Sequence, residues 1–145
     1  MNFLPLIDQP LKSPEVVDVL ECHDMEVVYD FDRLFEGTED RYHSSSTQGG
    51  FEFVFDSAQR LATVFLYITP SSGIAAIDAG SLDVPVYASV DAARHDFERG
   101  GGPIKQGDGW IKTLEGRIWR HYEFRDGNLS MITLTRDLVL VTPEG

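Results

Sequence analysis

The stretch that most restricts the fold of this chain spans residues 86–136, where the signals of a helix, a glycine turn and a hairpin follow one another. Residues 89–99 are predicted to be helical, because Ser89 can cap the first turn and apolar residues recur at helical spacing. Gly100 and Pro103 then end the helix. A helix followed by strands in this way predicts a helix packed against an antiparallel sheet.

Two tryptophans mark the strands that follow this helix. Trp110 opens a predicted strand over 110–114, and a second strand is predicted over 118–124. Asp126-Gly127 is a strong hairpin signal and leads into a returning strand over 129–136. Because tryptophan is a large apolar residue, at least one of the two is expected in the core.

The first half of the chain repeats this plan more faintly. Ser13-Pro14-Glu15 is a helix start, and the helix it opens is expected to end near residues 22–24. Residues 25–32 alternate between apolar and acidic side chains, which predicts a half-buried strand with an acidic outer face. The polar segment 34–50 is predicted to be a loop.

Three further strands are expected from apolar patterns. Residues 51–56 alternate with phenylalanine on the inner side, and residues 61–69 are more uniformly apolar, as in the middle of a sheet. A last apolar strand is predicted over 138–142. The fold class is therefore α+β: a single domain over 1–145, with an antiparallel sheet of about six to eight strands and two short helices. The two half-units, 13–75 and 86–142, indicate two tandem helix–hairpin repeats, joined edge to edge or packed together.

The chain is strongly acidic, with 24 acidic and 12 basic residues and a net charge of −12. Residues 1–75 hold 13 of the acids and 4 of the bases, and the acids are densest from Glu15 to Asp40. Such a field repels nucleic acid and anionic membranes, and it accelerates encounter with a basic protein. The alternative interpretation is a solvated face that keeps a small protein in solution.

No targeting segment or catalytic pattern is recognisable. The first residues lack the features of a secretory signal, no segment has the roughly 20 apolar residues of a membrane span, and Cys22 has no second cysteine to pair with, so a cytoplasmic protein is expected. The four histidines are scattered. Asp30 and Asp32 share a strand face, but exposed pairs of this kind are more often solvated than metal-bound. We therefore expect no enzyme activity, no metal and no cofactor.

The candidate functional residues are those suited to binding a protein partner. Trp119 falls on the polar face of its predicted strand, together with Arg117, His121 and Glu123, so it is a candidate interface anchor. Acidic and aromatic residues of the first half complete the set of candidate partner-binding residues, which are Tyr29, Asp30, Asp32, Phe35, Glu36, Glu39, Asp40 and Trp119.

The helix–turn–tryptophan–hairpin stretch also resembles known families. The run of Ser89, Asp91-Ala92-Ala93, Phe97, Gly100 and Pro103, followed by Trp110 and a hairpin, resembles the unit of the tandem-repeat β-lactamase-inhibitor proteins and of the small lipoprotein of the bacterial outer-membrane assembly machine. The chain also looks like small acidic bacterial immunity proteins. It departs from the inhibitors, which are secreted and disulfide-bonded, and from the lipoproteins, which need a lipidated N-terminal cysteine. The resemblance therefore implies an architecture and a protein-binding sheet, but neither specific activity.

These observations lead to one principal expectation and one alternative. The principal one is a cytoplasmic immunity or inhibitor protein that binds and occludes a cognate toxin or enzyme with a basic surface, with no nucleic acid or membrane partner. The alternative is a small-ligand-binding or regulatory module of the same fold, without catalysis, which would need an enclosed apolar pocket between helix 89–99 and the sheet.

Overall fold

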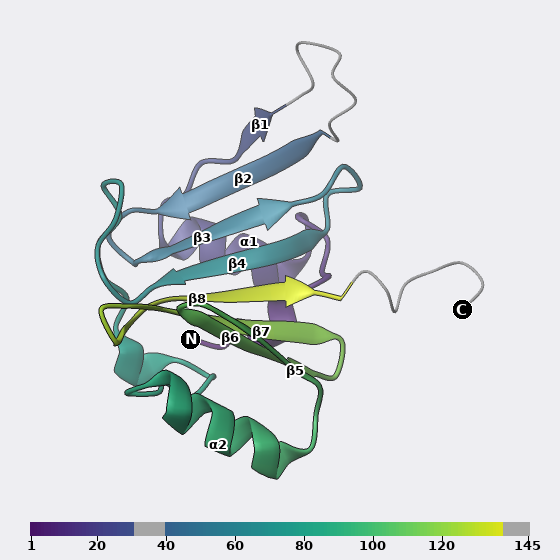
Figure 1. Ribbon diagram of the computed structural model, residues 1–145. Helices are drawn as coiled ribbons and strands as arrows, with labels where there is room; N and C mark the ends of the chain where they lie inside the picture. Colours follow the sequence, from purple (N-terminus) through teal and green to yellow (C-terminus); the bar gives the residue numbers. More distant parts are fainter. Residues whose placement is uncertain (31–39, 138–145) are drawn as a thin grey trace, which may run out of the picture.

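The structure is a computed structural model in which residues 1–30 and 40–137 are described. Its centre is one eight-stranded antiparallel sheet in the order β1-β2-β3-β4-β8-β7-β6-β5, accompanied by two α-helices (Figure 1). This confirms the predicted α+β class. The helices are α1 (Pro14–Cys22) and α2 (Val90–Gly100), with short 3-10 turns η1 (Leu4–Leu6) and η2 (Ala79–Ser81). The strands are β1 (Val28–Asp30), β2 (Arg41–Ser46), β3 (Phe51–Phe55), β4 (Leu61–Tyr67), β5 (Ile104–Gly107), β6 (Trp110–Glu115), β7 (Ile118–Arg125) and β8 (Asn128–Arg136).

The order of the elements is that of two successive units. In each unit a helix precedes four antiparallel strands, β1–β4 after α1 and β5–β8 after α2. The fourth strands of the two units pair with each other, from Thr63 opposite Thr135 to Tyr67 opposite Met131. The units therefore join edge to edge into one sheet, which leaves the short strands β1 and β5 at its two outer edges (Figure 1).

Both predicted helix starts are confirmed by their caps. The Oγ of Ser13 accepts a hydrogen bond from the backbone N–H of Val16 at 3.4 Å, and the Oγ of Ser89 accepts one from Ala92 at 3.1 Å. The C-terminal end of α2 lies one residue later than predicted. Gly101, with φ of 75°, takes the left-handed conformation that ends the helix, and Gly100 is still helical.

A continuous hydrophobic core lies between the helices and one face of the sheet. Alternate residues of β3 point into it, and Phe53 at its centre is 0% exposed. Val16 of α1 and Phe97 of α2 pack into the same core, and the Phe97 ring lies 5.8 Å from that of Tyr122 on β7. In the part of the chain that the structure describes, both helices therefore cover the same sheet face.

The prediction of a loop over 34–50 is wrong for Arg41–Ser46, which form strand β2. The segment is typical of a loop because it is polar, yet two of its inward positions are the small residues Ser44 and Ser46, both buried. The Oγ of Ser44 donates a hydrogen bond to the Glu26 carbonyl at 2.6 Å, which satisfies the buried hydroxyl. Pairing with β3 thus makes a strand of a segment whose own composition favours a turn.

Other strand predictions need smaller corrections. The strand predicted over 25–32 is observed as β1 over Val28–Asp30, and residues 31 and 32 lie outside the described residues. Strand β5 follows the glycine turn and was not predicted, because its four residues have no hydrophobic alternation. The strand predicted over 138–142 lies outside the described residues. None of the helices in the described ranges is long and apolar enough to cross a lipid bilayer.

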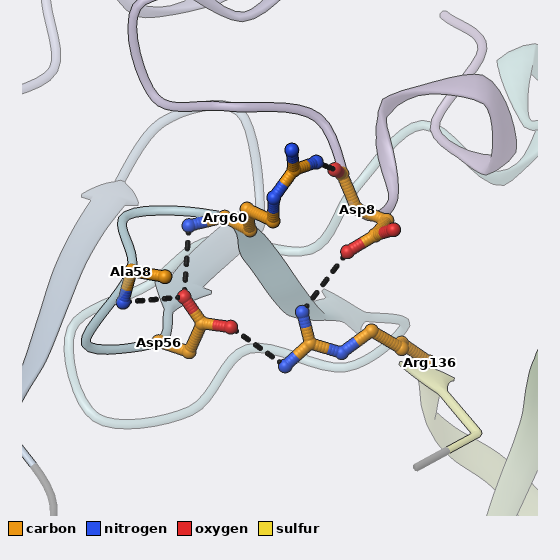
Figure 2. Close-up of polar contacts among 5 residues, drawn as sticks. All are labelled: Asp8, Asp56, Ala58, Arg60 and Arg136. Atoms are coloured by element: carbon orange, nitrogen blue, oxygen red, sulfur yellow. Dashed lines mark hydrogen bonds and ion pairs between the residues drawn. The ribbon is translucent and has the colours of Figure 1, made fainter. Parts of the chain in front are cut away.

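One group of charged side chains ties the two units to the N-terminal segment, as Figure 2 shows. Arg136 at the end of β8 reaches the Asp8 carboxylate at 3.1 Å and the Asp56 carboxylate at 2.8 Å. Asp56 also accepts hydrogen bonds from the backbone N–H groups of Ala58 and Arg60, each at 2.9 Å, which closes the β3–β4 turn. This group stabilises the fold where its segments meet.

Asp56 gives a prediction for the pH dependence of stability. Burial raises its pKa, but hydrogen bonds from Arg60 and Arg136 and the Arg136 charge outweigh that, so the pKa lies below its usual value. The folded state therefore gains stability from this carboxylate above the unfolded pKa of about 3.9, and the gain is lost as the pH falls through the folded pKa.

We expect Asp56→Asn to lower the free energy of unfolding at pH 7 by about 1–2 kcal/mol, because the amide keeps the turn acceptor but loses the charge facing Arg136. In urea unfolding from pH 7 to pH 3, the difference from wild type should stay constant down to about pH 5 and shrink below about pH 4. Asp78→Asn is the control, since Asp78 is exposed and its side chain caps only the short turn at Gly80. A deficit as large at pH 3 as at pH 7 would contradict the proposed charge pairing.

Candidate functional site: the open face of the sheet

The sheet face opposite the two helices is a candidate binding surface. Among the described residues no helix lies on it, and we call it the open face (Figure 1). Its side chains alternate with those of the core along every strand, and the pairing register arranges them in rows that run across the strands. One row contains Lys105, Lys112, His121, Thr133, Phe65, Glu52 and Ser45, and the next contains Trp119, Thr135, Thr63, Val54, His43 and Val28.

The second unit contributes a cluster of aromatic and basic side chains to this face, here called the Trp119 patch: Lys105, Trp110, Lys112, Trp119 and His121. The ammonium nitrogen of Lys112 lies 4.8 Å from the centre of the Trp119 ring, and that of Lys105 lies 5.2 Å from it. Both distances suit a cation–π interaction. The patch therefore combines a tryptophan with two positive charges drawn from β5, β6 and β7.

Trp110 lies on the same face and contacts two of its neighbours. Its ring stacks on the His121 ring with centroids 5.1 Å apart and an interplanar angle of 28°. On the other side it lies over Gly107, where an added Cβ would come within 2.4 Å of the Trp110 ring carbon Cε2. The glycine therefore makes room for the indole. The expectation that at least one tryptophan lies in the core is wrong, since both are half-buried on the open face.

The positive charge of the patch comes from its lysines at neutral pH. Burial lowers the pKa of His121, Glu123 opposes this effect and Lys112 adds to it, so the net change is a lowering from the usual value of about 6.5. His121 is therefore mostly uncharged at pH 7.

The opposite end of the open face is acidic, and its main carboxylate is already hydrogen-bonded. Glu52 accepts a hydrogen bond from the Tyr67 hydroxyl at 3.0 Å and another from the Ser45 hydroxyl at 2.8 Å. Burial, together with the Glu52 contact, raises the pKa of Tyr67 to about 12. Asp30 lies farther out, opposite Arg41 on the next strand. The open face thus carries two lysines on β5 and β6 and the carboxylates of Glu123 on β7 and Glu52 on β3.

The structure separates the candidate partner-binding residues predicted from the sequence. Asp32, Phe35, Glu36 and Glu39 lie outside the described residues. Tyr29 and Asp30 lie on the edge strand β1, and the Tyr29 hydroxyl donates a hydrogen bond to Asp40 at 2.6 Å, which raises the pKa of Tyr29 to about 12.

Tyr29 and Trp119 do not lie on a common surface. Tyr29 faces Tyr42, which in turn faces the core residue Phe55, so it lies on the helix-covered side of the sheet, whereas Trp119 lies on the open face. In strand order β1 and β7 are five positions apart, which corresponds to about 24 Å at roughly 4.8 Å per strand.

Arg120 is a charged residue that the sequence analysis missed, and it lies on the core side of β7. The residue is 8% exposed. Its Nη1 donates a hydrogen bond to the Tyr122 hydroxyl at 2.7 Å, its Nε is 2.9 Å from the Glu115 carboxylate, and its guanidinium lies over the Phe97 ring. The alternation of 118–124 signals this position, because Arg120 has the same parity as Tyr122 and Phe124.

Arg120 also lines a hollow of about 660 Å³ at the C-terminal end of α2. Asp96, Arg99 and Glu115 contribute to the same lining. Between α2 and the sheet itself, Ala93 and Phe97 pack against Tyr122 and Ile111. The hollow is therefore charged and open at its rim, unlike the enclosed apolar pocket that a small-ligand module would need.

The described residues contain no group of three or more His, Cys, Asp and Glu side chains that could hold a metal ion. Cys22 is an exposed free thiol at the end of α1. A scan of protein-family models and searches of curated proteins and of solved structures found no match to this chain.

Proposed function

We propose that this chain is an immunity or inhibitor protein that binds a cognate toxin or enzyme and occludes it, with no catalysis of its own. The observation that carries the proposal is the open face, a broad sheet surface with Trp119 and Trp110 half-buried on it and both helices packed on the other side. Half-buried tryptophans on a sheet face that no helix covers are typical anchors of protein interfaces. The occupant we propose for this face is a protein, in the cytoplasm of a bacterial cell.

Net charge supports a partner that is basic overall. At −12 for 145 residues the chain attracts a positively charged protein and repels nucleic acid over distances up to about a Debye length, roughly 8 Å at physiological salt. Exposed acids of α1, including Glu15 and Glu21, belong to the helix-covered side. In the proposed mechanism these charges accelerate encounter, and the open face makes the lasting contact that blocks the partner's site.

The test is capture of the partner followed by an activity assay. The tagged chain is used to isolate its partner from the native cell, the partner is identified and purified, and its activity is measured with and without one equivalent of this chain. We expect stoichiometric inhibition, and an association rate that falls as salt is added. A partner that stays fully active when bound would refute the proposal, and an association rate independent of salt would refute the steering by charge.

Trp119→Ala gives the sharpest mutational prediction for the interface. We expect the affinity for the captured partner to fall by about 2–4 kcal/mol, or roughly 30- to 1000-fold, because a central tryptophan anchor is lost. Isothermal titration calorimetry measures the affinity, and thermal unfolding verifies that the variant is folded.

Tyr29→Ala is the matched control, because it removes another aromatic ring from the opposite side of the sheet at the β1 edge. Its effect on affinity should stay below about 0.5 kcal/mol. The reverse result, a large loss for Tyr29→Ala and none for Trp119→Ala, would place the interface at the acidic edge and refute the role of the open face.

A further inference from the structure

We infer that the Trp119 patch is a binding site for a carboxylate-bearing, acidic segment of a partner protein. The inference rests on the proposed function and deepens it, because it assigns opposite charges to two parts of the partner. A partner that is basic overall would place an acidic segment over β5–β7 and its basic region toward β1–β3.

The two lysines of the patch, Lys105 and Lys112, lack carboxylate partners. Within the described ranges, the ion pairs involve Arg94, Arg99, Arg120 and Arg136, and neither Lys105 nor Lys112 has a carboxylate within 4.0 Å. Both ammonium groups instead lie over the face of one indole ring. Their charges are therefore available to a carboxylate from outside the described part of the chain.

The positive charges of the two lysines lie close together. Lys105 and Lys112 are directly opposite each other on β5 and β6, where cross-strand Cβ atoms lie about 5 Å apart. Like charges placed directly opposite each other destabilise a sheet, and here the Trp119 ring that both ammonium groups approach offsets part of that cost. A carboxylate from solvent would interact with both ammonium groups at once and relieve their mutual repulsion. A carboxylate is therefore the ligand that this pair of charges favours.

Aromatic rings lie beside the two lysines. Trp119, together with Trp110 stacked on His121, provides a flat aromatic surface beside the charges. Such a surface suits the apolar part of a peptide next to its carboxylates. Glu52 lies farther along the same row, on β3. Its carboxylate accepts hydrogen bonds from the hydroxyls of Tyr67 on β4 and Ser45 on β2. On this face the two lysines lie on β5 and β6, whereas the carboxylates of Glu123 and Glu52 lie on β7 and β3, so an acidic segment is favoured over β5 and β6.

Nucleic acid is the less suitable polyanion for this patch. Its affinity grows with the number of phosphates neutralised, and the patch offers two lysines in a molecule of net charge −12. A short acidic peptide segment needs only the local charges, because those of the rest of the molecule are screened beyond about 8–10 Å.

The test uses a hexaglutamate peptide as the probe, with hexalysine and single-stranded oligo(dT) for comparison, at about 100 mM salt, where the Debye length is about 10 Å. The readout is tryptophan fluorescence, and Trp119→Phe shows which part of the signal belongs to Trp119. We expect hexaglutamate to bind and to change that emission, with both effects lost by about 1 M salt, where the Debye length is about 3 Å. Hexalysine should not bind at this patch.

The double variant Lys105→Gln/Lys112→Gln should weaken hexaglutamate binding about fivefold or more, since two exposed charge pairs and their effect on the ring are removed. Lys112→Gln alone is compared with Lys12→Gln, which makes the same change of charge at an exposed position of the N-terminal segment and should leave binding unchanged. Absence of hexaglutamate binding, an equal loss in Lys12→Gln, or tighter binding of oligo(dT) would each overturn the inference.

These results can be distinguished from failure of the proposed function, because the peptide experiment needs no toxin. Hexaglutamate binding together with a captured partner that is not inhibited would leave the acidic-segment site standing and refute the immunity role. A partner that is inhibited equally well by wild type and by the double variant would refute the site and leave the immunity role intact.

Discussion

Replacement of Phe53 by alanine is expected to lower the free energy of unfolding by about 3–5 kcal/mol, among the largest losses of any single change in this chain. Phe53 is 0% exposed, and its ring lies 5.4 Å from that of Phe51 and 6.1 Å from that of Phe55. The Phe3 ring of the N-terminal segment meets it edge-on at 6.4 Å. The substitution leaves a cavity where the strand and the N-terminal segment meet, and it also removes aromatic contacts worth about 0.5–1.5 kcal/mol per pair.

Urea unfolding monitored by circular dichroism measures this loss. Phe53→Leu is the companion variant, because it keeps most of the volume and should cost less than half as much, so a folded protein is available for comparison. A loss below about 1 kcal/mol for Phe53→Ala would show that this ring does not lie at the centre of the core.

Gly50→Ala is expected to cost about 3 kcal/mol or more, although it adds a single methyl group. Gly50 has φ of 80°, a conformation that costs a residue with a side chain roughly 1–2 kcal/mol. A Cβ there would also lie 2.4 Å from the backbone nitrogen of Ile77 and 2.7 Å from the carbonyl oxygen of Ala75. The connection between β4 and α2 crosses the β2–β3 turn at this point, where the Ala75 N–H donates to the Thr47 carbonyl at 2.7 Å.

Gly73→Ala separates these two costs. Gly73 has nearly the same φ, 81°, but an added Cβ would find no atom within 4 Å. Its substitution should therefore cost only the conformational part, about 1 kcal/mol. Thermal and urea unfolding of both variants give the difference, which measures the backbone contact at Gly50. Equal losses in the two variants would mean that the connection moves aside freely.

Several parts of the fold could be predicted from the sequence because their causes are local. Ser13 and Ser89 cap their helices because a hydroxyl three residues before an unpaired N–H can reach it in any context. Asp126 and Gly127 take φ of 52° and 82°, as their hairpin signal predicts. The alternation along 118–124 correctly placed Trp119 on the face away from Tyr122, because side chains alternate between the two faces of any strand.

The candidate site was predicted only in part, because one of its strands shows no pattern in the sequence. Trp119 was identified from the polarity of its own strand. Lys105 was not, because β5 is too short to show a pattern and exists only through its pairing with β6. The other candidates came from the first half of the chain because acidic side chains are numerous there. Tyr29, one of these candidates, is five strand positions away from Trp119 and lies on the other side of the sheet.

The sequence by itself determined the class of fold, both helix starts, the last hairpin and the strong negative charge of this chain, because each depends on residues close together or on composition alone. The tertiary structure alone decided that β4 pairs with β8, that the polar segment Arg41–Ser46 is a strand, and that two lysines meet over Trp119. Those features depend on pairing between segments far apart in the chain. Their stability comes from shared hydrogen bonds and from burial between partners, and neither segment carries that information alone.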